Sequence, residues 1–167
     1  NEKSFGSAKR ALYAAILHQQ VGLDFIVDQH AADGTLAKYK VLYLTDNHVS
    51  QASSKHIAQW VKNGGTLFAT AGAGMFDEYN QPNSIMRGLY GVEQTALDAP
   101  ANAQVGFLKE DLPFKNAIDT VTLKIDGKEY TLPALGIRSR ITLKGADALG
   151  KFSDGSPALA TRKVGKG

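Results

Sequence analysis

The sequence predicts an α/β fold in which a parallel sheet in the first half is extended by antiparallel strands in the second. Two observations support this prediction. Residues 1–79 alternate helical patterns with short apolar runs, which is typical of parallel βαβ units. Residues 120–161 instead alternate apolar with polar side chains and contain two Asp-Gly turns, which is typical of antiparallel hairpins.

The first half is expected to contain two helices. Alanine, leucine and isoleucine side chains within residues 4–20 recur at three- and four-residue spacings, which predicts one helix. Ser50 is the expected N-cap of a second helix that runs through Lys62, and Gly64 is expected to take the left-handed conformation that ends it. Residues 31–39 are predicted as a connector with one helical turn.

Three short apolar runs in the same half are predicted as strands, of which the second is expected to be covered on both faces and the third to be buried. They are residues 23–27, 41–44 and 66–70. A helix or connector separates each run from the next, so we expect the strands to be parallel.

The second half is expected to form hairpins. Residues 120–125 and 129–132 flank one Asp-Gly turn, and residues 149–152 and 158–161 flank the other. Between the two halves, residues 80–118 contain three prolines and are predicted as a helix near residues 85–90 plus irregular loops.

Composition excludes several classes of protein. A chain of 167 residues with 43% hydrophobic and 21% charged residues is ordinary for one soluble domain. No apolar run approaches the roughly 20 residues that span a bilayer, and no signal-peptide pattern opens the chain, so no membrane partner is predicted. Lysines and arginines are spread among acids without interleaved aromatic residues, so nucleic acid is not a predicted partner despite the net charge of +3. Nothing in the sequence indicates the compartment.

Four segments, in this order, resemble the class I glutamine amidotransferase-like, flavodoxin-like superfamily. The closest resemblance is to the trimerisation domain of family 42 β-galactosidases. The segments are residues 21–28, residues 36–44, residues 58–70 with Gly74 and Asp77-Glu78 behind them, and residues 148–167. The resemblance implies a flavodoxin-like, three-layer fold: a parallel sheet with helices on both faces and added antiparallel hairpin strands.

The ends of the chain predict a fragment of a longer protein. The first residue is Asn1 and not methionine, and the chain stops at Gly167, where a further strand is expected. Domains of the family that the chain resembles usually begin with a strand before the first helix and finish with one after the Gly-Lys-Gly motif. Residues 1–167 are therefore predicted as a single amidotransferase-like domain of a larger polypeptide.

The chemistry of amidotransferases is not supported by these residues. Their mechanism needs a cysteine on the strand-to-helix turn and a histidine, with a glutamate nearby, late in the chain. The chain has no cysteine, and its last histidine is His56. A serine nucleophile is missing as well, because the Gly72-Ala-Gly74 turn lacks the serine of a hydrolase elbow. No catalytic residue, cofactor or metal is predicted.

One interpretation of the acidic loops is a ligand pocket where two predicted parallel strands end, because ligands of open α/β sheets bind at that edge. The alternative interpretation, which we favour, is that the acids of these loops cap helices and hold turns. Carboxylates beside an imidazole would suit acid/base chemistry or a divalent cation. The residues of the candidate pocket are Asp46, His48, Gly72, Gly74, Asp77 and Glu78.

The predicted function is scaffolding or oligomerisation, without catalysis, in a carbohydrate-active protein. The expected partners are further copies of the chain or other domains of a parent protein. Two alternatives stay open. One is a small-molecule or sugar hydrolase that uses the acidic loops. The other is a binding module for a carbohydrate ligand, in which Tyr79 or Tyr90, aromatic residues expected at a loop or helix edge, would stack on a sugar.

Overall fold

The structure is a computed structural model that describes residues 2–98, 117–135 and 137–167. They form two compact units, which are described separately here. The parallel unit comprises Asn1–Leu89 together with Lys163–Gly167, and the antiparallel unit comprises Tyr90–Arg162. No helix in the described ranges is both long and apolar enough to cross a membrane.

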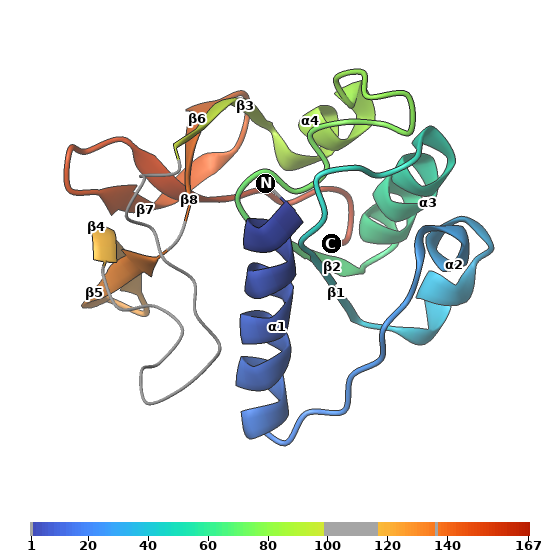
Figure 1. The fold of residues 1–167 in the computed structure, drawn as a ribbon, viewed down its shortest axis with the longest axis horizontal. Helices are drawn as coiled ribbons and strands as arrows, with labels where there is room; N and C mark the ends of the chain where they lie inside the picture. The colour runs from blue at the N-terminus through green and yellow to red at the C-terminus, as the bar shows by residue number, and fades with distance from the viewer. Residues whose placement is uncertain (1, 99–116, 136) are drawn as a thin grey trace. The chain divides into compact units, whose positions relative to one another are not determined.

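The parallel unit contains one βαβ motif and additional helices (Figure 1). Strands β1 and β2 pair in parallel, from Val41 opposite Thr66 to Leu44 opposite Ala69, and α3 connects them. The predicted bounds of β1 are confirmed, but its expected cover on both faces is not, because Val41 and Tyr43 are 43% and 44% exposed. The elements are α1 (Glu2–His18), α2 (Asp28–Ala32), the 3-10 helix η1 (Thr35–Lys38), β1 (Val41–Leu44), α3 (Gln51–Lys62), β2 (Thr66–Ala69) and α4 (Ser84–Tyr90).

Helix α3 begins and ends as its sequence predicts. The Ser50 hydroxyl accepts the backbone N–H of Ser53 at 3.1 Å, which satisfies one free donor of the first turn. Gly64 follows the helix with a φ of +119°. The next residue, Gly65, must also be glycine, because a Cβ there would lie 2.3 Å from the Trp60 ring. The expected cap and the expected C-terminal glycine are confirmed.

The last residues of the chain close the parallel unit against the end of α3. The backbone N–H of Lys166 donates to the Lys62 carbonyl at 3.0 Å. Gly165 has a φ of +64°, and a Cβ there would lie 2.6 Å from the same carbonyl oxygen. At Gly167 a Cβ would come within 2.2 Å of the Val61 carbonyl oxygen. The Gly-Lys-Gly motif therefore permits a backbone approach that no residue with a side chain could make.

The predicted strand at residues 23–27 is wrong. These residues carry no helix or strand assignment, and α2 follows them where only a connector was expected. A strand requires a hydrogen-bonded neighbour, and within the described residues β1 pairs with β2 alone. The α/β class is confirmed. With one two-stranded parallel sheet among the described residues, the flavodoxin-like three-layer sheet is not confirmed.

The antiparallel unit contains two sheets within its described residues. Strand β3 pairs with β6, and a four-stranded sheet has the order β5-β4-β7-β8. Both predicted hairpins are confirmed. In the first, Asp126 and Gly127 have φ values of +51° and +76°, the left-handed pair of a tight hairpin turn. The strands are β3 (Val92–Asp98), β4 (Ala117–Ile125), β5 (Lys128–Leu135), β6 (Arg138–Leu143), β7 (Asp147–Phe152) and β8 (Pro157–Thr161).

Strand β3 lies where irregular loops were expected, so that prediction is wrong for residues 92–98. Its partner β6 begins 40 residues after β3 ends, since Arg138 pairs with Asp98, and no turn signal announces so distant a pairing. Residues 99–116 of the predicted loop lie outside the described residues. Strand β5 extends past its predicted end through Pro133, which is tolerated because β5 is the outermost strand of its sheet.

Candidate functional site

Two loops leave the carboxyl ends of β1 and β2 and run side by side. The N–H of Gly74 donates to the Asp46 carbonyl at 2.9 Å, and the N–H of Phe76 donates to the Asn47 carbonyl at 3.0 Å. The N–H of Val49 returns a bond to the Phe76 carbonyl at 3.0 Å. The parallel strands thus bring the two predicted site loops together at one edge of the sheet.

The two glycines of the second loop, which follows β2, adopt left-handed backbone conformations. Gly72 and Gly74 have φ values of +80° and +65°, and both are buried. Left-handed conformations of this kind are easily adopted only by glycine. Because the N–H of Gly74 is already given to the Asp46 carbonyl, it is not available to an anion.

Asp46 and His48 are exposed and already have polar partners. Both carboxylate oxygens of Asp46 lie near the Lys9 ammonium of α1, at 2.8 and 2.9 Å. The two ring nitrogens of His48 lie 2.8 Å from Asn47 Oδ1 and 3.1 Å from Asn80 Oδ1. The imidazole is therefore positioned by two side-chain amides and not by a carboxylate of the candidate site.

Asp77 is 3% exposed and satisfied on both oxygens. Its Oδ1 accepts the backbone N–H groups of Tyr79 and Gln81, each at 2.9 Å, and its Oδ2 accepts the Gln51 amide at 2.9 Å. The Gln51 bond, followed by that from Gln81, holds the pKa of Asp77 below its usual value. A carboxylate held ionised in this way is suited to fixing a turn and poorly suited to taking up a proton.

Glu78 accepts a backbone hydrogen bond at the start of α3. Its Oε2 accepts the N–H of Gln51 at 2.7 Å, and Asp28 Oδ1 accepts the N–H of Ser50 at 3.2 Å. Acids at a helix N-terminus satisfy free donors and interact favourably with the helix dipole. Of the two interpretations of the acidic loops, the hydrogen bonds of Asp77 and Glu78 support the capping one.

A groove of about 670 Å³ lies next to this edge of the parallel unit. It is lined by α1, by residues 21–28 and by β1, and most of its lining side chains are apolar. Asp46 and His48 line it, whereas Gly72, Gly74 and the acids of the second loop do not. Within the described part of the chain, no three His, Asp or Glu side chains are grouped to hold a metal ion. Ligand binding by the six candidate residues stays a prediction.

No sequence pattern indicated a buried amide that joins loops and helices of the parallel unit. The Asn83 amide nitrogen donates to the Val49 carbonyl at 3.0 Å and to the Ser54 hydroxyl at 2.8 Å. Its oxygen accepts the N–H of Met86 at 3.1 Å, at the start of α4. A polar residue before a helix suggests a cap, but only the fold shows that its other donor reaches α3.

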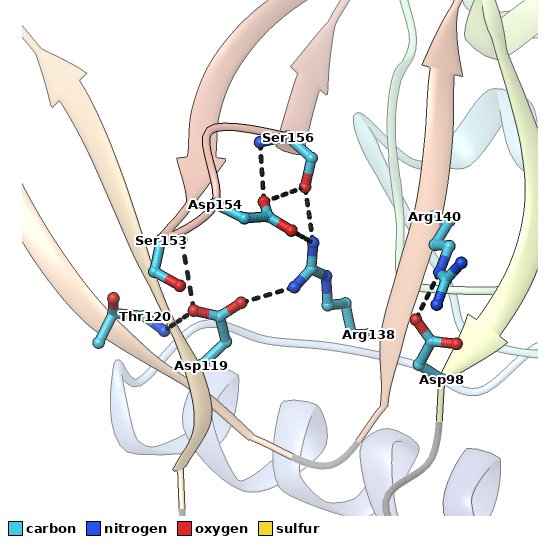
Figure 2. Close-up of polar contacts among 8 residues, drawn as sticks. All are labelled: Asp98, Asp119, Thr120, Arg138, Arg140, Ser153, Asp154 and Ser156. Atoms are coloured by element: carbon cyan, nitrogen blue, oxygen red, sulfur yellow. Dashed lines mark hydrogen bonds and ion pairs between the residues drawn. The ribbon is translucent and has the colours of Figure 1, made fainter.

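The antiparallel unit contains a polar cluster around Arg138 that the sequence also did not indicate. Figure 2 shows the guanidinium at the start of β6 pointing toward Asp119 of β4 and the turn between β7 and β8. It donates to Asp119 Oδ2 at 2.8 Å, to the Ser156 hydroxyl at 2.7 Å, and to Asp154. It also lies 4.1 Å from the centroid of the Phe152 ring. Arg138 thereby connects the two sheets of the unit.

The carboxylates of this cluster are held in their charged form. Hydrogen bonds from Ser153 and the Thr120 backbone lower the pKa of Asp119, and Arg138 adds to the effect. The Ser156 hydroxyl, then the guanidinium, lowers the pKa of Asp154. The cluster is a candidate structural anchor because both terminal nitrogens of the guanidinium are bonded to its acceptors, although the buried Arg138 Nε has no hydrogen-bond partner among the described residues.

Together, the fold and the site define a mixed α/β domain. Most of its conspicuous polar groups form hydrogen bonds that fix its own loops and sheets. The model of one protein family, described as the β-galactosidase trimerisation domain, matches residues 3–167. The chain belongs to this family. No curated protein sequence matches the chain.

Several solved β-galactosidase structures share the fold. The GH42 enzyme Gan42B from G. stearothermophilus has a TM-score of 0.67 at 22% identity, covering 93% of this chain and 21% of that one. The cold-adapted enzyme from Rahnella sp. R3 has a TM-score of 0.69 at 22% identity, covering 93% and 22%. The enzyme from Bacillus circulans sp. alkalophilus has 0.63 at 19% identity, covering 81% and 20%. The chain thus spans about a fifth of the length of these structures.

Proposed function

We propose that residues 1–167 form one domain of a longer, carbohydrate-active protein and that this domain holds its subunits together as a trimer. The observation that carries the proposal is the match of the trimerisation-domain family to residues 3–167. The similar β-galactosidases support it, because each is about five times as long as the stretch it shares with this chain. The role proposed is assembly, and catalysis would belong to other parts of the protein.

The amidotransferase-like, flavodoxin-like relationship is part of the same proposal. Its support is the parallel β1-α3-β2 motif followed by a glycine-rich loop at the carboxyl end of β2. In an amidotransferase that loop would carry the cysteine, whereas here Gly72 and Gly74 serve the backbone contact with the preceding loop. The position fits an ancestral active site whose loop now has a structural role.

For the subunit contact we propose the apolar face of the hairpin formed by β4 and β5. Tyr130 and Leu132 project from one face of β5, and they pair with Leu123 and Val121 of β4. Tyr130 is 44% exposed and Leu132 is 50% exposed, at the outer edge of their sheet. Exposed apolar side chains that continue a buried apolar face are typical of surfaces that bind another copy.

The experiment compares Leu132→Asp with Thr131→Asp in the full-length polypeptide. Thr131 is also exposed and lies on the opposite face of the same strand, so the two variants add the same charge at neighbouring positions. We expect Leu132→Asp to shift the sedimentation equilibrium toward monomers and Thr131→Asp to leave the trimer intact. Neither variant should change the melting temperature of the isolated subunits. Trimers of equal stability in both variants would contradict this placement of the contact.

The hydrolase and carbohydrate-binding alternatives are not favoured. Asp77 and Glu78, which they require, are engaged with the Gln51 side chain and backbone. Exposed Tyr79 and groove-lining His48 are the residues through which a sugar could still bind. A thermal shift of the full-length protein with oligosaccharides would support that alternative.

A further inference from the structure

Asn63 and Gly64, at the end of α3, form the one Asn-Gly pair of the sequence. Glycine has no side chain to hinder its backbone nitrogen, so in such a pair this nitrogen can attack the side-chain carbonyl of the asparagine. The asparagine then loses ammonia, a reaction called deamidation. Both residues are exposed, so water reaches them. Asn63 therefore has the highest intrinsic tendency to deamidate of any asparagine in the chain.

The reaction proceeds through a ring that includes the backbone. The Gly64 nitrogen loses its proton and forms a bond to Cγ of Asn63. The bond from Cγ to Nδ2 breaks, and the nitrogen leaves as ammonia with that proton. The product is a five-membered succinimide, and water opens it at either of its two carbonyls. Aspartate or isoaspartate then stands at position 63, and water is the only co-reactant.

The end of α3 holds Asn63 in the wrong conformation for this ring. Ring closure needs the Gly64 nitrogen on the same side as Cβ of Asn63. With a ψ of −4°, Asn63 instead places that nitrogen beside its own backbone nitrogen. The N–H of Gly64 also donates to the Val61 carbonyl at 2.9 Å, so the proton that must leave is held in a hydrogen bond. The closed turn thus withholds the attacking nitrogen.

The side chain of Asn63 is held less firmly than the backbone. Its Oδ1 accepts a hydrogen bond from Gln59 Nε2 at 3.1 Å, and this bond is exposed to solvent. A single exposed hydrogen bond contributes little, because water replaces it readily. Protection of Asn63 therefore depends on the backbone turn.

The segment Lys163–Gly167 packs against this turn from outside. The N–H of Lys166 donates to the Lys62 carbonyl at 3.0 Å, and a Cβ on Gly165 would lie 2.6 Å from the same oxygen. A Cβ on Gly64 would lie 3.8 Å from Lys166 Cβ. A large rotation about the Cα–C bond of Asn63 would move Gly64 against this segment. The segment therefore helps to keep the turn closed.

We propose that Asn63 is a latent deamidation site, which the last turn of α3 and the segment Lys163–Gly167 keep unreactive in the folded protein. The reaction proceeds when this turn opens locally, without unfolding of the rest of the parallel unit. The proposal goes beyond the proposed function and does not depend on trimerisation.

Deamidation would prevent the turn from closing again. A carboxylate at position 63 lies at the C-terminus of α3, where negative charge interacts unfavourably with the helix dipole. Isoaspartate also adds one methylene to the backbone, two residues before Gly65, where even a Cβ would lie 2.3 Å from the Trp60 ring. The modified protein should therefore lose the contact between Lys166 and the end of α3.

Peptide mapping of the full-length protein over time measures the reaction. Cleavage after Lys62 and Arg87 gives one peptide that contains both Asn63 and Asn83. The Asn83 amide is buried and hydrogen-bonded, so Asn83 reports on wider unfolding. We expect Asn63 to deamidate at least about tenfold faster in denaturant than in the folded protein. Equal rates under the two conditions, or no deamidation in denaturant, would overturn the proposal.

Gly165→Ala tests the terminal segment, because the added Cβ displaces it from α3. We expect Asn63 to deamidate at least about threefold faster than in the wild type, while Asn83 keeps its rate. Gly127→Ala is the matched control, since it also places alanine at a positive φ but in a hairpin of the antiparallel unit. It should leave the Asn63 rate unchanged. An unchanged rate in Gly165→Ala, or equal acceleration at Asn63 and Asn83, would contradict the local opening.

Hydrogen exchange of the wild-type protein tests the opening without any substitution. The Gly64 amide donates to Val61, so it exchanges only when the turn opens. We expect its protection relative to the denatured chain to match, within about tenfold, the slowing of Asn63 deamidation. A Gly64 amide that exchanges as fast as in the denatured chain would show an open turn and overturn the proposal.

Discussion

The two units of the chain pair their strands in opposite ways. In the antiparallel unit, β4 pairs with β5 across a two-residue turn, and β7 pairs with β8 across another short turn. In the parallel unit, β1 and β2 are separated by the whole of α3, and one edge of β1 has no strand beside it in the described structure. Parallel pairing needs long connections, so such a unit depends more on chain that is remote in sequence.

The polar groups of the two units differ in the same way. The parallel unit uses Asp77 and Glu78 to hold single loops and one helix N-terminus. The antiparallel unit uses one guanidinium, that of Arg138, to join strands of two sheets. We therefore expect destabilising substitutions in the parallel unit to act by removing packing. Those in the antiparallel unit should act by breaking the Arg138 cluster.

The largest effect is expected from Ile57→Ala in α3. Ile57 is 2% exposed, so truncation leaves a cavity in the parallel unit. We expect the free energy of unfolding to fall by about 3 kcal/mol. Gln59→Ala, an exposed substitution on the same helix, should change it by less than about 0.5 kcal/mol. Chemical denaturation of both variants provides the measurement, and equal stabilities would show that α3 does not carry the core.

Gly165→Ala is expected to have the next largest effect. Its Cβ would lie 2.6 Å from the Lys62 carbonyl oxygen, and its φ of +64° is unfavourable for alanine. We expect a loss of about 2 kcal/mol or more. Gly127→Ala is the matched control, because its φ is +76° but its Cβ would meet no atom within 4 Å, leaving conformational strain of about 1 kcal/mol. Equal losses in the two variants would rule out the close approach to α3.

Arg138→Met tests the cluster of the antiparallel unit. The substitution leaves Asp119, with a side chain 7% exposed, without its cation, while Asp154 keeps its serine partner. We expect the thermal midpoint to fall by several degrees. Arg140→Met is the control, because its ion pair with Asp98 involves side chains that are 65% and 40% exposed, where such pairs contribute little. A control that melts as low as Arg138→Met would mean that the cluster has no special role.

The smallest effect concerns pH. Asp119 and Asp154 have folded-state pKa values below those of an unfolded chain, so they contribute stability that is fully present above about pH 4. This contribution is lost as the pH falls below 4 and the carboxylates become protonated. Asp119→Asn should therefore flatten the decline of the thermal midpoint between pH 4 and 2, whereas Asp126→Asn in the exposed hairpin turn should keep the wild-type curve. If the curves of thermal midpoint against pH run parallel for the wild type and both variants, the charge of Asp119 does not contribute to the pH dependence of stability.

Sequence patterns predicted the elements whose signals are local. The N-cap Ser50, the apolar run of β1 and the Asp-Gly hairpins all lie within a few residues of the structure they specify. Strand β3 was missed because its partner β6 is distant in sequence, and residues 23–27 form no strand because no described strand pairs with them. An apolar run indicates that a segment can be a strand, but only a hydrogen-bonded neighbour makes it one.

The candidate site was predictable to a similar degree. The meeting of the two loops at the edge of β1 and β2 followed from parallel strands, and the bond from Gly74 to Asp46 confirms it. The roles of Asp77 and Glu78 could not be read from the sequence, because they depend on where Gln51 lies. Arg138 was missed because its partners are 16 and 19 residues away and form no motif.

The central claim is that this domain assembles subunits, and sedimentation equilibrium of the full-length polypeptide tests it most directly. We predict a mass of three subunits that persists as the protein is diluted through the micromolar range. A mass of one subunit over the same range would contradict the claim.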